Sequence, residues 1–213
     1  PHGRFISRVQ SATKGNVLLR KRQYQLSDDE SWSLHVARLM IGGKIQNYRN
    51  ILRRYIRDYG ENENINRAVQ VLEHAKREAL ATQDKTTLIG YEGMASNAYF
   101  EVLPVLILNQ KADFPFHGRN RRPPKDAVNA MLSFAYTLIA NDTSAALETV
   151  GLDPYVGFLH TLRPGRTSLA LDMMEELRAY LGDRFVLSLI NKRQITSKDF
   201  LFQGDNGVVM TDK

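Results

Sequence analysis

Residues 27–59 read SDDESWSLHVARLMIGGKIQNYRNILRRYIRDY and set the expected fold class. The first four of them match a capping box, in which Ser27 and Glu30 satisfy free amides at a helix start. Gly42 and Gly43 either kink this helix or let a neighbouring element come close. Apolar side chains recur every three or four residues and predict one long amphipathic helix; they are Ile41, Ile45, Tyr48, Leu52, Tyr55 and Tyr59.

Apolar residues recur at the same helical period elsewhere in the chain. Residues 65–80 and 128–139 each carry one such stripe, and residues 183–191 carry a shorter one. Small residues surround Glu92 in the segment 90–98, so its backbone can approach another helix or a DNA strand closely. These patterns predict a mainly α, multi-helix domain.

The two ends of the chain read differently from the helical middle. Residues 1–26 are expected to be an extended connector, with extended patterns at Arg4 to Val9 and at Asn16 to Leu19. At the other end, Phe200-Leu201-Phe202 and Val208-Val209-Met210 bracket a glycine-containing turn, which predicts a small β-hairpin. We therefore expect a single α-helical domain over residues 27–213.

Composition limits the classes of protein that fit. The 213 residues are 43% hydrophobic, enough for a sizeable core, and they contain no cysteine, which excludes disulfides and thiolate metal sites. The longest apolar run, Val102 to Leu108, is too short to cross a membrane. Lys and Arg exceed Asp and Glu by 29 to 23, a formal charge of +6 that points to a polyanionic partner.

One imidazole and several carboxylates suggest a divalent metal site. Asp172 and Glu175 are three residues apart in a predicted helix over 167–178, so their oxygens can converge, although Glu176 lies within reach as well. Leu169, Met173, Leu177 and Tyr180 are expected to form the apolar stripe of this helix.

His160 is expected to lie beside Asp172. A short helix that starts at Asp153-Pro154 and a Pro164-Gly165 corner would fold back on the next helix and bring the imidazole alongside. The alternative is that His160 is an ordinary core or surface residue. Spacing alone does not separate the two readings.

Two basic segments are candidates for phosphate contact. Arg49, Arg53 and Arg57 recur every fourth residue, and they form either a stripe along a phosphate backbone or a solvated helix face. The loop of residues 114–125 displays Arg119, Arg121 and Arg122 between prolines and a glycine. In the same loop, Phe114 and Phe116 either stack on unpaired bases or anchor the loop to the core.

Together these segments resemble one known family, the CRISPR-associated spacer-acquisition integrases called Cas-one (Cas1). The similarity covers nearly the whole chain and is closest to members from type I-C systems. It rests on five segments in order: GNVLLR at 15–20, GYEG at 90–93, RRPPKDAVNA at 121–130, GLDP and GFLH at 151–154 and 157–160, and LALDMME at 169–175.

The resemblance carries further expectations. It implies a helical catalytic domain with Glu92, His160 and Asp172 as metal ligands, and with Glu175 at a further acidic position. It places Tyr136 near the site. Family members have a β-rich domain before the point where this chain begins, so we expect a fragment of a longer protein. For the full-length protein the resemblance implies a cytoplasmic homodimer with a small partner protein, Cas-two (Cas2).

The ligand types indicate the chemistry. Carboxylates with one imidazole suit Mg²⁺ or Mn²⁺, which can polarise a phosphodiester. Together with the resemblance, this implies a metal-dependent DNA endonuclease and integrase. Attack of a 3′-OH on a repeat phosphodiester joins two DNAs, whereas attack of water cuts. His160 acts in this scheme as a ligand or, alternatively, as a general base.

The main alternative function is a non-catalytic DNA-binding scaffold, and a second is a helical nucleotide hydrolase. The scaffold explains the basic groups but leaves the acidic cluster without a purpose. Negative charge inside a phosphate-binding groove is repulsive unless a cation lies between.

Overall fold

The computed structural model describes residues 16–204 and 207–211. Its elements, in chain order, are α1 (Val17–Asp28), α2 (Glu30–Tyr59), α3 (Glu63–Ala81), α4 (Lys85–Leu106), α5 (Ala127–Thr149), α6 (Ser168–Leu177), the π-helical turn η1 (Arg178–Asp183), α7 (Arg184–Asn191), the 3₁₀ turn η2 (Ser197–Asp199), β1 (Phe200–Phe202) and β2 (Val208–Met210). The mainly α prediction is confirmed. The hairpin is confirmed as well, because β1 and β2 pair antiparallel with Phe200 opposite Met210. The extended pattern at Arg4 to Val9 lies outside the described residues.

The beginning of the helical region differs from the expectation. Asn16 caps α1, because its side-chain oxygen accepts from the amides of Leu18 and Leu19 at 3.1 and 3.3 Å, so the extended reading of 16–19 is wrong. Helix α2 begins after Asp29, whose carboxylate accepts from the amide of Ser31 at 3.0 Å. Ser27 belongs to the last turn of α1, so the capping box at 27–30 is not formed.

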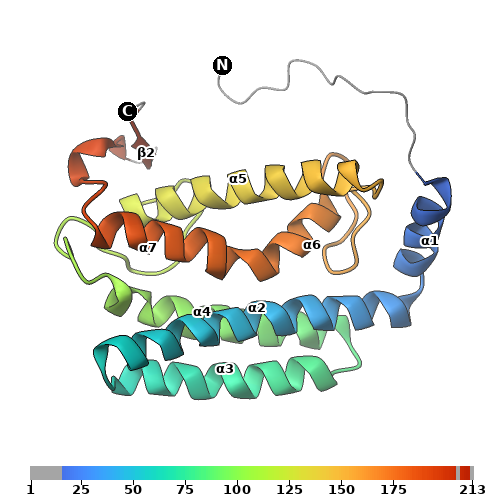
Figure 1. Ribbon diagram of the computed structural model, residues 1–213, viewed down its shortest axis with the longest axis horizontal. Coiled ribbons are helices and arrows are strands. Elements are labelled where there is room, and N and C mark those ends of the chain that lie inside the picture. Colours follow the sequence, from blue (N-terminus) through green and yellow to red (C-terminus); the bar gives the residue numbers. More distant parts are fainter. Residues whose placement is uncertain (1–15, 205–206, 212–213) are drawn as a thin grey trace.

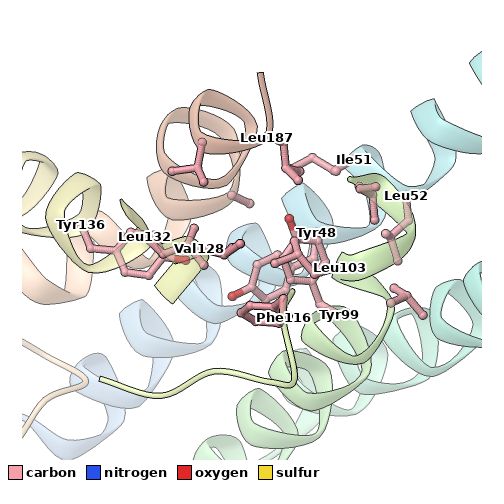
Figure 2. Close-up of a cluster of buried hydrophobic side chains, with 14 of the residues drawn as sticks. Tyr48, Ile51, Leu52, Tyr99, Leu103, Phe116, Val128, Leu132, Tyr136 and Leu187 are labelled. Atoms are coloured by element: carbon pink, nitrogen blue, oxygen red, sulfur yellow. The ribbon is translucent and has the colours of Figure 1, made fainter. Parts of the chain in front are cut away.

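Helix α2 runs through the middle of the molecule (Figure 1). Helices α3 and α4 pack on one side of it, and the run α6–η1–α7 packs on the other with α5 above. Most of the predicted stripe of α2 faces this interior, because Ile41, Ile45 and Leu52 are fully buried. Its last member, Tyr59, is 62% exposed, so the prediction is wrong there. The centre of this interior is the stacked pair of Tyr48 and Tyr99, whose ring centroids lie 3.9 Å apart (Figure 2).

The two glycines of α2 serve close packing rather than a kink. A Cβ at Gly42 would lie 2.8 Å from the Leu80 side chain, and one at Gly43 would lie 2.8 Å from that of Glu176. Helix α2 continues through both positions. The second of the two predicted alternatives is therefore confirmed, and it lets α3 and α6 approach α2 from different sides.

Candidate active site

The segment that carries His160 is a loop, so the short helix expected from Asp153-Pro154 is wrong. Other parts of the chain bind its backbone instead. The carbonyl of Pro154 accepts from the amide of Leu169 at 2.9 Å, and that of Asp153 accepts from the Gln23 side chain at 2.8 Å. The expected fold-back onto α6 is present all the same, and it brings His160 beside Asp172.

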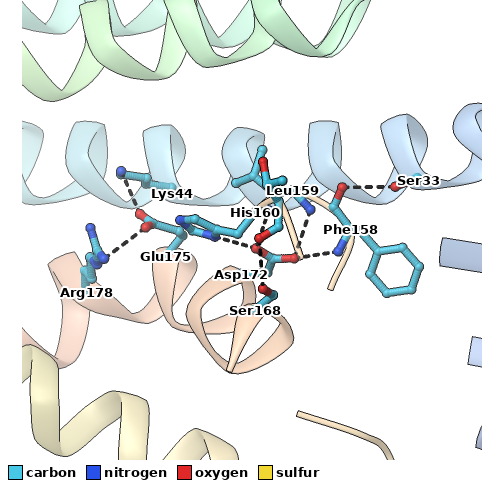
Figure 3. Close-up of polar contacts among 10 residues, drawn as sticks. Ser33, Lys44, Phe158, Leu159, His160, Ser168, Asp172, Glu175 and Arg178 are labelled. Atoms are coloured by element: carbon cyan, nitrogen blue, oxygen red, sulfur yellow. Dashed lines mark hydrogen bonds and ion pairs between the residues drawn. The ribbon is translucent and has the colours of Figure 1, made fainter. Parts of the chain in front are cut away.

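Asp172 is the anchor of this loop (Figure 3). Its Oδ2 accepts from the amides of Phe158 and Leu159 at 2.6 and 2.9 Å, and its Oδ1 accepts from the His160 amide at 3.0 Å. The Nδ1 of His160 lies 2.5 Å from the same Oδ1. Since a carboxylate only accepts, Nδ1 carries the proton and Nε2 is left to act elsewhere. Asp172 is fully buried, and each oxygen already has two donors.

The buried face of α6 is the acidic one, which corrects the predicted stripe. Leu169 is buried as expected, but Met173, Leu177 and Tyr180 are 39%, 37% and 58% exposed. The residues that face inward are Ser168, Leu169, Ala170, Asp172, Met174 and Glu175. The choice left open between two glutamates is also decided, because Glu175 is buried and Glu176 is exposed.

Lys44 joins the carboxylates of two different helices. Its ammonium forms ion pairs with Glu92 on α4 and with Glu175 on α6, the second at 2.7 Å. Ser96 donates to the same Glu92 oxygen at 2.8 Å, and Arg178 binds the other Glu175 oxygen at 3.0 Å. The two glutamates therefore converge on one buried cation. The imidazole of His160 lies next to Glu175 (Figure 3).

These charges shift the pKa values in opposite directions. Burial acts to raise the pKa of Glu175, but Lys44 and Arg178 outweigh it and hold that pKa below its ordinary value. Burial acts to lower the pKa of Lys44, but Tyr48, Glu175 and Glu92 outweigh it and hold that pKa above its ordinary value. The pair is therefore ionised at neutral pH.

The donor set matches a hard divalent cation. Two carboxylates and one imidazole nitrogen, without sulfur, are ligands that Mg²⁺ and Mn²⁺ accept. Over residues 16–204 and 207–211, however, no three His, Cys, Asp or Glu side chains are arranged to hold an ion. Lys44 supplies the positive charge between Glu92 and Glu175. The donor types of these side chains, rather than their present spacing, suit such an ion.

The predicted arginine stripe is only partly free. Arg49 is paired with Glu73 on α3, and Arg57 is paired with Asp58 at 3.0 Å. No described residue forms an ion pair with Arg53. Arg53 instead lines a hollow of about 520 Å³ between α2 and η1, together with Asn50, Ile51, Arg54, Arg57, Tyr180 and Arg184. Four guanidinium groups thus surround one concave surface.

The 114–125 loop is held more tightly than its sequence suggests. Phe114 and Phe116 are 1% and 4% exposed, so they anchor the loop and the base-stacking alternative is wrong. Arg119 is tied down rather than displayed, since it donates to Asn129 Oδ1 at 2.7 Å and to Ser133 at 3.1 Å. Arg121 and Arg122 are exposed, as predicted.

Sequence reasoning missed two residues of this site. Lys44 lies three residues after Ile41 and four before Tyr48, so it falls on the buried stripe of α2, where a lysine needs a partner. Arg178 could have been found from its spacing, because a residue three positions after Glu175 on a helix is its neighbour and can pair with it. Tyr136, placed near the site by resemblance, is buried and donates to Asp183 at 2.5 Å. Its role in the reaction stays a prediction.

Comparison with known proteins assigns the chain to a family. The family model described as "CRISPR associated protein Cas1" matches residues 1–213. The chain belongs to the Cas1 family. The I-C subtype stays a prediction, as do Glu92, His160 and Asp172 as a ligand set.

Individual relatives agree with this assignment. The "CRISPR-associated endonuclease Cas1 1" of Chlorobaculum tepidum is 48% identical over 214 residues, which cover 99% of this chain and 62% of that relative. A solved structure, the "Partial Cas6-RT-Cas1--Cas2 complex", aligns with a TM-score of 0.85 and 26% identity over 99% of this chain and 63% of that one. A second solved structure, a "Casposase bound to integration product", aligns with a TM-score of 0.76 and 25% identity. This alignment covers 92% of this chain and 56% of that one.

This Cas1 chain spans 62% of the length of that relative, and the same share of a Cas1 endonuclease of Rhodospirillum rubrum. Within the described part of the chain, no helix is long and apolar enough to span a membrane.

Proposed function

We propose that this chain provides the catalytic centre of a metal-dependent DNA endonuclease and integrase that inserts captured DNA into a CRISPR array. The observation that carries the proposal is the convergence of Glu92 and Glu175, from two helices, on one buried cation beside His160. The names of the relatives support it, since they include Cas1 endonucleases and a casposase bound to an integration product.

Glu92, His160 and Glu175 are the residues that would hold Mg²⁺ or Mn²⁺. The sequence-based set had Asp172 in place of Glu175. We favour Glu175 because both oxygens of Asp172 are already occupied by backbone amides and by His160. Asp172 then fixes the tautomer and orientation of the imidazole, as carboxylates behind metal-bound histidines do. When bound, the metal would polarise the scissile phosphodiester and lower the pKa of the attacking hydroxyl.

The chemistry is a single exchange at phosphorus. The oxygen of a 3′-hydroxyl forms the new P–O bond, the bond to the leaving 3′ oxygen of the repeat strand breaks, and the leaving oxygen takes up a proton. With water in place of the 3′-hydroxyl the same exchange is hydrolysis. Lys44 and Arg178 keep Glu175 ionised before substrate arrives, and the fixed His160 presents Nε2 to the site.

DNA would reach this site along basic and open surfaces. The hollow beside Arg53 and Arg184 lies roughly two to four helical turns beyond Lys44 on α2. The exposed Arg121 and Arg122 offer a second set of phosphate contacts. On α4, no atom lies within 4 Å of a Cβ built at Gly90 or Gly93, so the helix surface beside Glu92 is open. Cas2 and a second Cas1 copy are the protein partners that we propose for the full-length protein.

The catalytic proposal is tested by DNA joining with purified full-length protein. His160→Ala and Glu92→Gln are expected to abolish Mn²⁺-dependent strand transfer on a gel, while fluorescence anisotropy shows DNA affinity retained. Arg77→Ala, on α3, is the matched control and should join normally, because within the described part of the chain Arg77 pairs only with Glu78 and His74. Normal joining by both site variants would instead support the scaffold function.

The DNA-binding proposal is tested by the salt dependence of affinity. Arg53→Ala and Arg184→Ala should each weaken binding on every DNA sequence. Each lost phosphate contact should flatten the log–log salt slope by roughly 0.7 to 0.9. An unchanged slope would mean that this arginine makes no phosphate contact and belongs to the solvated surface.

A further inference from the structure

Behind the acidic site, one aromatic ring lies between two guanidinium groups. The ring of Tyr136 on α5 has Arg178 at 5.0 Å from its centroid and Arg119 at 5.3 Å. Cations over an aromatic face are attracted by its quadrupole, more strongly where water is excluded. Tyr136 is 7% exposed and Arg178 is 9% exposed. The ring therefore restrains the same guanidinium group that binds Glu175.

The Tyr136 ring is itself held from η1. Its hydroxyl donates to Asp183 at 2.5 Å, and Asp183 is fully buried. A Cβ at Gly182 would lie 2.9 Å from the ring, so only glycine permits this approach. Three consecutive contacts thus connect Asp183 to Tyr136, Tyr136 to Arg178, and Arg178 to Glu175.

The π-helical turn makes these contacts possible. In an α-helix, residues five apart such as Arg178 and Asp183 point about 140° away from each other. A π-helix closes its hydrogen bonds from residue i to i+5, so the fifth residue returns to the same side. Both residues are buried and both contact Tyr136. Continuing α6 as an ordinary helix would turn one of them away.

We propose that Tyr136 and Asp183 are positioning residues that hold Arg178, and through it Glu175, in the geometry required for catalysis. This rests on the proposed function, since it assigns Glu175 to the reacting centre. Among the described residues, neither forms a hydrogen bond or ion pair with Glu92 or Glu175, and the contacts that lead from them to Glu175 run through Arg178. Partners behind ligating residues typically change metal affinity or activity by about 10–100-fold when they are removed.

Four variants, two at Tyr136 and two at Asp183, separate the steps. Tyr136→Leu removes the ring and should lower the Mn²⁺-dependent joining rate by about 10–100-fold with DNA affinity unchanged. Tyr136→Phe keeps the ring between the arginines and should lose less. Asp183→Ala removes the acceptor for the hydroxyl and should be impaired, whereas Asp183→Asn keeps an acceptor oxygen and should recover most of the rate.

A buried leucine supplies the control for a purely structural effect. Leu132 lies one turn from Tyr136 on α5 and is buried, so Leu132→Ala destabilises the fold while keeping the ring that contacts Arg178. If Tyr136→Leu and Leu132→Ala lower the rate equally at equal loss of stability, the inference is overturned. The Mn²⁺ affinity, measured by electron spin resonance, should fall in Tyr136→Leu and not in Leu132→Ala.

One readout does not depend on activity. In nitrogen-labelled protein, the side-chain Nε–H signal of Arg178 should be shifted by the ring current of Tyr136 in the wild type and in Tyr136→Phe. It should return towards its ordinary position in Tyr136→Leu. If the wild type joins no DNA, the proposed function is wrong, but this result does not test the positioning of Arg178. That part of the inference is then tested by the Arg178 signal. An Arg178 signal unmoved by Tyr136→Leu overturns it.

Discussion

Glu175 and Asp183 are carboxylates eight residues apart, both buried, yet their surroundings act on them in opposite ways. Glu175 on α6 lies between the full charges of Lys44 and Arg178, which hold its pKa down against burial. Asp183 on η1 receives the hydroxyl of Tyr136 at 2.5 Å and faces that of Tyr99, so its hydrogen-bond partners are neutral hydroxyls. Burial raises the pKa of Asp183 to about 6. The nearest charges, rather than depth, therefore decide which acid is kept ionised.

The largest effect is expected at a third carboxylate, Asp172, which is held by amides rather than by cations. Asp172→Ala leaves the buried amides of Phe158, Leu159 and His160 without their acceptor and should cost about 3–5 kcal/mol of unfolding free energy. Urea unfolding measures it. His160→Ala removes one donor and should cost clearly less. Equal losses would show that the loop is held by other contacts.

The comparison itself predicts opposite signs for two isosteric changes. Glu175→Gln should destabilise the protein at neutral pH by about 1–3 kcal/mol, because Lys44 and Arg178 lose a charged partner. Asp183→Asn should stabilise it by up to about 3 kcal/mol above a pH of about 6. The amide stays neutral, whereas the carboxyl of Asp183 must ionise in a buried place. Urea unfolding at a pH of about 7.5, above the raised pKa of Asp183, compares the two variants.

Acidification should bring the two variants back towards the wild type. The raised pKa of Asp183 means that its stabilising contribution is complete below the ordinary value of 3.8 and is lost as pH rises through about 6. The groups facing it, Tyr136, Tyr99, Arg178 and Arg119, all favour or tolerate the charged form but do not outweigh burial. For Glu175 the contribution is present above the ordinary value of 4.5 and is lost as pH falls. Parallel pH profiles would contradict the comparison.

The smallest effects are expected at two glycines, one beside each acid. Gly182→Ala would drive a Cβ to 2.9 Å from the Tyr136 ring, which is fixed between two arginines, and should cost about 1–3 kcal/mol. Gly43→Ala meets the exposed end of Glu176 at 2.8 Å, which can swing away, and should stay within about 0.5 kcal/mol. Thermal unfolding of the Gly182→Ala and Gly43→Ala variants measures the two losses of stability. An equal loss at Gly43 would mean that α6 is packed as tightly as η1.

Much of the site followed from spacing, and particular residues show where spacing failed. The three-residue interval between Asp172 and Glu175 predicted a shared helix face, which the structure confirms. The same helix was given the wrong buried stripe, because apolar periodicity assumes that carboxylates face water. Here Lys44 and the amides of the His160 loop stabilise the acids in the interior, so Met173 and Tyr180 face outward. The phenylalanines of the 114–125 loop were equally ambiguous until the core that covers them was known.

The sequence by itself determined the mainly helical fold, the C-terminal hairpin and the helices that carry Glu92, Asp172 and Glu175. Each of these depends on residues within a few turns of one another, where backbone hydrogen bonding and period decide the outcome. Only the tertiary structure decided which carboxylate meets which cation, since Lys44 and Glu92 are 48 residues apart. It also decided that α6 widens into a π-helical turn. Such pairings depend on packing between helices, because a buried charge takes whichever partner the assembled core brings within reach.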